Sequence, residues 1–172
     1  MTQRANNSKM MEQFRRSKEV FQRYLEGYGG KKHYLEFGIG CTTQWALGVE
    51  GLTILSIDED PSWIDESFDS LSKEQQSRIK FKYSEFKDKT DKSAQKFASA
   101  IHSTFLIPDV ITIGSGPTDI IGKEVIKYVK NKNTNPYIFI WTTGKKSKEF
   151  AEDYLNPIDG TEDLLLRPYT VK

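Results

Sequence analysis

The sequence predicts an α/β fold, a doubly wound three-layer sandwich in which helices cover both faces of a mostly parallel sheet. Apolar strand-like segments alternate with helical segments about five times along the 172 residues. The stretch "YIFIWTT" at 137–143 is a continuous apolar run, which is typical of a strand buried on both faces. No repeat or long linker divides the chain, so we expect residues 1–172 to form a single domain.

The N-terminal part predicts one helix before the first strand. Residues 1–8 are polar and we expect them to be frayed, whereas a helical apolar pattern begins at Met10. A glycine pair ends this pattern, which gives an N-terminal helix over about 9–28. "HYLEFG" at 33–38 is then the first predicted strand.

The next segments predict a short helix, a second strand and a third helix. "TTQWALGVEG" at 42–51 reads as the short helix, and "LTILSID" at 52–58 is an apolar, β-branched strand that closes on an acid. "DPSWIDESFDSL" starts the following helix, with Asp60 as its N-cap and Pro61 at its first helical position.

Three further strands are predicted at 79–83, 108–114 and 137–143. The helix before the fourth strand is expected to bury one apolar face, formed by Ala94, Phe97, Ala98, Ile101 and Phe105. The amphipathic stretch "IIGKEVIKYVK" and residues 147–155 predict two more helices. "EDLLLRPYTV" reads as a last strand.

Composition excludes several classes of protein. Apolar residues make up 37% and charged residues 28%, as in a soluble globular protein. A net charge of +1 gives no field for a polyanion, so we expect no nucleic-acid partner. No run approaches the length of a membrane span, so we expect no membrane association and a cytoplasmic location. The one cysteine, Cys41, allows no internal disulfide and makes a zinc site unexpected.

The turn after the first strand carries the main functional signal. Gly38 and Gly40 allow the backbone to approach a ligand where strand order reverses in such sheets. A dinucleotide fingerprint would need a third glycine, but Thr43 occupies that position. Glu36 would repel a pyrophosphate and attract an ammonium group. A nucleoside that carries a cationic amino acid and no phosphate, S-adenosylmethionine, meets both conditions.

The stretch "LEFGIGCTT" resembles motif I, E/D-x-G-x-G, of class I S-adenosylmethionine-dependent methyltransferases. "TILSIDEDPSW" is similar to the family's second-strand segment, whose final acid holds the ribose hydroxyls; here that acid is Asp58. The likeness covers roughly residues 30–65, and residues 79–143 agree only in the order of elements. The resemblance implies the family's Rossmann-like sheet, which ends in antiparallel pairing near the C-terminus.

The resemblance also implies which residues bind the cofactor. Adenine would lie against the residue after the second-strand acid and against the loop after the third strand. The expected cofactor-binding residues are Glu36, Gly38, Ile39, Gly40, Asp58, Glu59, Ser84, Glu85 and Phe86. We expect Trp63, on the helix after Asp60, to pack in the core.

The catalytic residue is unknown from the sequence. Relatives often carry Asp-Gly-Pro after the fourth strand, whereas this chain has "GSGP" at 114–117. The candidates there are Ser115 and Asp119, of which Asp119 is expected to cap the following helix. No cluster of Asp, His and Glu has the spacing of a metal site, so no metal is expected.

Two functions remain open at this point. The first is a methyltransferase that acts on a small molecule, because methyl transfer from a sulfonium needs alignment more than a base. The second is an inactive binding module or partner subunit of the same fold, which the missing acid favours. The chain lacks a large insertion over the acceptor, so another subunit could complete the site and a homo-oligomer is left open.

Overall fold

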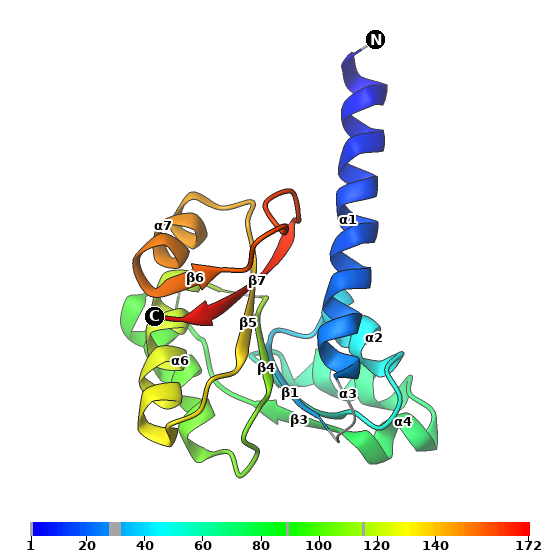
Figure 1. Ribbon diagram of the computed structural model, residues 1–172. Helices are drawn as coiled ribbons and strands as arrows, with labels where there is room; N and C mark the ends of the chain where they lie inside the picture. The colour runs from blue at the N-terminus through cyan, green and yellow to red at the C-terminus, as the bar shows by residue number, and fades with distance from the viewer. Residues whose placement is uncertain (1, 28–31, 89, 115) are drawn as a thin grey trace.

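The computed structural model describes residues 2–27, 32–88, 90–114 and 116–172. Their strands form one seven-stranded sheet in the order β3-β2-β1-β4-β5-β7-β6 (Figure 1). The strands are β1 (His33–Phe37), β2 (Thr53–Asp58), β3 (Ile79–Tyr83), β4 (Val110–Ile113), β5 (Tyr137–Trp141), β6 (Leu155–Pro157) and β7 (Leu166–Val171). The helices are α1 (Thr2–Glu26), α2 (Cys41–Leu47), α3 (Pro61–Asp69), α4 (Lys73–Arg78), α5 (Asp91–Ala98), the 3-10 helix η1 (Ser99–Ser103), α6 (Thr118–Lys132) and α7 (Lys145–Tyr154).

The sheet confirms the predicted doubly wound topology. Strands β1 to β5 pair in parallel, and β7 runs antiparallel to both β5 and β6. Strand β1 lies between β2 and β4, so strand order reverses at β1. The carboxyl ends of β1, β2 and β4 therefore meet at one edge, which is where such sheets bind ligands.

Two apolar cores cover the two faces of the sheet. Leu35 and Phe37 point to the core under α5, α6 and α7, whereas Tyr34 points to the core under α1 and α2. This alternation follows from the two-residue repeat of a strand. Glu36 is therefore forced onto the same face as Tyr34, below the helix α2 that follows the glycine turn.

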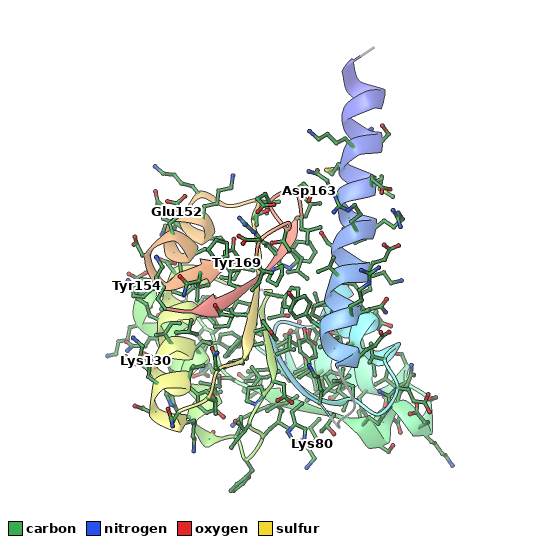
Figure 2. The ribbon with its side chains drawn as sticks, in the orientation of Figure 1. Lys80, Lys130, Glu152, Tyr154, Asp163 and Tyr169 are labelled. Carbon is green, nitrogen blue, oxygen red and sulfur yellow. The ribbon has the colours of Figure 1, made fainter. Side chains whose placement is uncertain are left out.

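Helix α1 is long and packs on the sheet through only part of its length (Figure 1). Phe21 and Leu25 are buried, whereas Met10, which the pattern assigned to the same face, is 53% exposed. Arg16 forms an ion pair with Asp163, which lies on the loop before β7 beside the helix (Figure 2). The helix begins at Thr2, so the expectation of a frayed segment over 1–8 was wrong for residues 2–8, and Met1 lies outside the described residues.

Other differences from the sequence prediction are local. Helix α4 and the short strand β6 were not predicted. Phe105 was expected on a buried helical face, but it is fully exposed because η1 ends at Ser103 and the chain turns away before it. The N-cap prediction is confirmed, since the Asp60 side chain accepts hydrogen bonds from the N–H groups of Ser62 and Trp63. Within the described ranges, no helix combines the length and apolar character needed to cross a membrane.

Candidate functional site

A cavity of about 530 Å³ opens at the carboxyl edge of the sheet. Residues 38–42 after β1 and Asp58 at the end of β2 line one half of it. Gly114 after β4, together with Trp141 and Ser147 beside the end of β5, lines the other half. The cavity thus lies where strand order reverses, which is the position where open α/β sheets bind their ligands.

The glycine turn brings bare backbone to this cavity. Gly38 has a φ of 93°, in the region that favours glycine, and its N–H donates to the carbonyl of Ile57 at 2.8 Å. Gly40 has an extended φ of −170°, and a Cβ built on it would meet no atom within 4 Å. Gly38 is therefore required by the turn itself, whereas the absent side chain of Gly40 leaves space beside the cavity.

Asp58 holds this turn from the neighbouring strand. Its Oδ2 accepts from the N–H of Ile39 at 2.8 Å, and its Oδ1 accepts from the N–H of Asp60 at 2.9 Å. The residue is 8% exposed and lines the cavity. Each carboxylate oxygen can accept a second hydrogen bond, so Asp58 retains capacity for a ligand hydroxyl.

Glu36 lies beneath the cavity and is fully buried. Its Oε2 accepts from the hydroxyls of Tyr34 at 2.9 Å and Thr42 at 2.8 Å. Its Oε1 accepts from the hydroxyls of Thr43 at 2.5 Å and Ser56 at 2.8 Å. Burial raises the pKa of Glu36 above its ordinary value, and the four hydroxyl donors partly oppose that rise. Thr42 lines the cavity and Glu36 does not, so the expected contact between Glu36 and a ligand stays a prediction.

The register of the sheet explains how this polar cluster forms. Glu36 of β1 pairs with Ser56 of β2 on one side and with Thr112 of β4 on the other. All three are fully buried, in strands that are otherwise mostly apolar. Ser56 was not predicted as a partner of Glu36. One polar residue near the end of each apolar strand is the signal that could have revealed it.

Trp63 lies on the glycine turn and is not a core residue. Its side chain is 46% exposed, and its Nε1–H donates to the carbonyl of Ile39 at 3.3 Å. The expectation of core packing was therefore wrong, because α3 contributes no buried residue and contacts β3, the strand at the edge of the sheet. Trp63 and Asp58 together hold both the carbonyl and the N–H of Ile39.

The loop after β3 begins beside the end of β2. The N–H of Ser84 donates to the carbonyl of Asp58 at 2.9 Å, and its hydroxyl donates to the carbonyl of Phe97 at 3.0 Å. Phe86 packs against Phe97 with ring centroids 5.8 Å apart. Ser84 is thus held at the strand-end acid and Phe86 against Phe97, and both lie outside the lining of the cavity.

The two acids predicted near adenine lie on the outside of this region. Glu59 is exposed and directly follows Asp58. Glu85 forms ion pairs with Lys87 at 2.7 Å and with Lys96 at 3.1 Å, and these lysines lower its pKa. Neither acid lines the cavity, so their adenine contacts stay predictions.

Of the two catalytic candidates, only Asp119 lies within the described residues. Ser115 lies outside the described residues. Asp119 lies in the first turn of α6, whose N-cap is Pro117 and which has no side-chain cap, so the expected capping role was wrong. The Oδ1 of Asp119 is buried and has no hydrogen-bond partner in the described part of the chain. No group of three or more potential metal ligands occurs in the described ranges.

The part of the cavity near β5 is lined by hydroxyls and an indole. Thr118 and Ser147 join the starts of α6 and α7 through a hydrogen bond of 3.1 Å between their hydroxyls. Trp141 packs on Phe14 of α1 and Trp45 of α2, with ring centroids 6.4 Å and 6.2 Å apart. Among the described lining residues, Asp58 and Cys41 are the ionisable ones, and both lie in the other half.

No protein-family model matches the sequence, and no curated protein sequence matches it. Solved structures with the same fold do match. A methyltransferase-like protein from Silicibacter pomeroyi aligns with a TM-score of 0.68 and 14% identity, over 90% of this chain and 84% of that one. A precorrin-6y C5,15-methyltransferase from Geobacter metallireducens aligns with a TM-score of 0.55 and 17% identity, over 90% and 84%. Aeropyrum pernix fibrillarin, solved with natively bound S-adenosyl-L-methionine, aligns with a TM-score of 0.51 and 12% identity, over 89% and 74%.

These structures define the class of fold to which the chain conforms. It has the Rossmann-like fold of class I S-adenosylmethionine-dependent methyltransferases, as its motifs predicted.

Proposed function

We propose that the cavity at the carboxyl edge binds S-adenosylmethionine and that the protein is a methyltransferase acting on a small molecule. The observation that carries the proposal is Asp58, a cavity-lining carboxylate that is anchored to the glycine turn at Ile39. A carboxylate in this position can accept hydrogen bonds from both hydroxyls of a ribose. The fold adds support, because fibrillarin shares it and was solved with this cofactor.

The chain's own groups suit transfer by alignment. Bound S-adenosylmethionine would supply an activated methyl group on a sulfonium. Asp58 would fix the ribose, and the bare backbone of Gly38 and Gly40 would let the rest of the nucleoside approach closely. Thr118, Trp141 and Ser147 in the other half would orient the acceptor and exclude water.

A small, uncharged acceptor agrees best with the composition of this half. Its described lining holds no lysine, arginine or histidine that could pair with a phosphate. The net charge of +1 also provides no attraction for a polyanion. The lack of an ionisable side chain there favours the second candidate as well, an inactive binding module of the same fold.

Calorimetry with S-adenosylmethionine, S-adenosylhomocysteine and NAD tests the cofactor. We expect both sulfur nucleosides to bind and NAD not to bind. Failure of both sulfur nucleosides would exclude the enzyme and the binding module together. Transfer of a tritiated methyl group to small molecules of a cell extract would then distinguish the enzyme from the module.

Gly40→Ala is expected to weaken S-adenosylhomocysteine binding by about tenfold or more, equivalent to roughly 1.4 kcal/mol. The added methyl meets no protein atom within 4 Å, so it would occupy only space that the ligand needs. The melting temperature should change little, because the mutation neither clashes nor removes a contact. Calorimetry and thermal unfolding of the same sample measure the two effects.

Gly48→Ala serves as the matched control for this variant. Gly48 follows α2 outside the cavity lining, and its added methyl would meet its nearest neighbours at an ordinary 3.4 Å. Its binding should equal that of the wild type. Tight binding by Gly40→Ala would show that the ligand does not approach the glycine turn.

A further inference from the structure

The carboxylate of Glu36 has no free hydrogen-bonding capacity. A carboxylate has about four lone-pair sites, and four hydroxyls already donate to this one. The side chain is fully buried, and Thr42, which is itself buried and lines the cavity, donates to it. A ligand ammonium could reach Glu36 only after one of these hydrogen bonds had been broken.

A hydrogen-bonded relay connects Glu36 to the glycine turn. The N–H of Gly40 donates to the hydroxyl oxygen of Thr43 at 2.9 Å. The same hydroxyl donates its proton to Oε1 of Glu36 at 2.5 Å. Since Thr43 must accept from Gly40, its proton can serve only an acceptor on the other side, and Glu36 supplies that acceptor.

We infer that Glu36 is a positioning residue that sets the shape of the donor-binding turn through Thr43, and that it makes no direct contact with the donor's ammonium group. The inference rests on the proposed function of the cavity. In this chain, the acid of motif I would then orient the protein backbone and would not bind the ligand directly. Contacts to the ammonium are then left to groups that line the cavity, such as the oxygen of Thr42.

Two hydroxyls that share Oε1 provide a matched pair of variants. Thr43→Val and Ser56→Ala each remove one hydrogen bond to that oxygen. Only the Thr43 hydroxyl also holds the N–H of Gly40. A general loss of stability should therefore be similar for the two variants, whereas a loss of turn geometry should follow Thr43 alone.

The test compares two ligands by calorimetry. S-adenosylhomocysteine carries the ammonium group, and 5′-methylthioadenosine lacks the whole amino-acid portion. We expect Thr43→Val to weaken both ligands by about the same factor, roughly tenfold, and Ser56→Ala to change either by less than about threefold. A loss in Thr43→Val that is confined to S-adenosylhomocysteine would overturn the inference, as would equal losses in the two variants.

Hydrogen exchange of the ligand-free protein separates this inference from the proposed function. Exchange at residues 38–42 should become faster in Thr43→Val than in Ser56→Ala or the wild type. If the wild type binds no sulfur nucleoside, the proposed function fails, yet this difference still decides whether the Thr43 hydroxyl, through which Glu36 would act, holds the turn. Equal exchange in the two variants would show that it does not.

Discussion

Asp58→Ala is expected to weaken S-adenosylhomocysteine binding at least about tenfold, or roughly 1.4 kcal/mol, with little change in the overall fold. The variant would lose the acceptor for the ribose hydroxyls. It would also release the N–H groups of Ile39 and Asp60, which the carboxylate now holds at 2.8 Å and 2.9 Å. Calorimetry at fixed pH and salt measures the loss, with circular dichroism to verify folding.

Two further variants separate the direct effect from the structural one. Asp60→Ala removes only the cap of α3, which accepts from the N–H groups of Ser62 and Trp63. It should cost about 1 kcal/mol of stability and leave binding nearly unchanged. Asp58→Asn keeps the shape but offers one acceptor oxygen in place of two, so its binding should fall between the wild type and Asp58→Ala. Binding by Asp58→Ala equal to that of the wild type would refute the ribose assignment.

The positions of β1 to β5 along the chain were predictable because each of these strands is a short apolar or alternating segment bounded by turn signals. Strand β3, predicted at 79–83, occupies those residues in the structure. Helix α4 has no apolar period in "KEQQSR", and it is held instead by a capping box at Ser72 and by hydrogen bonds from Arg78 to the carbonyls of Leu47 and Val49. Strand β6 spans three residues and exists only because β7 pairs with it.

The candidate site also has one part that the sequence predicts and one part that it does not. The turn at Gly38 and the acid Asp58 could be predicted because glycine and a strand-end acid have local meanings. The surroundings of Glu36 could not, because Ser56 is 20 positions away and reaches the acid only through sheet register. A sequence pattern that places an acid before a glycine turn does not show whether that acid points into the ligand site or beneath it.

Glu36→Ala is expected to destabilise the protein by about 3 kcal/mol or more, because it leaves up to four buried hydroxyls without their acceptor. Glu36→Gln should cost less, since the amide keeps one oxygen for two of those hydroxyls. Urea unfolding at constant pH measures both changes. A loss below about 1 kcal/mol in Glu36→Ala would show that the cluster contributes little to stability.

The pH dependence of the free energy of unfolding, compared between the wild type and Glu36→Gln, gives a second test whose direction can be predicted. Burial raises the pKa of Glu36 above its ordinary 4.5, so the folded protein holds this proton more tightly than the unfolded chain does. Protonation of Glu36 therefore stabilises the folded state fully below about pH 4.5, and this stabilisation is lost as pH rises through the folded-state pKa. The free energy of unfolding of the wild type, relative to Glu36→Gln, should decrease from acidic toward neutral pH.

Glu124→Gln is a matched control, because the contribution of Glu124 to stability should change with pH in the opposite direction. Burial tends to raise the pKa of Glu124, but hydrogen bonds from Lys127, Gln95 and His102 outweigh burial, and the pKa is lowered. Its contribution is present above the ordinary 4.5 and is lost as pH falls through the lowered value. The stability advantage of the wild type over Glu124→Gln should therefore increase with pH. Curves of the same slope for the two variants would show that burial does not set the proton affinity of Glu36.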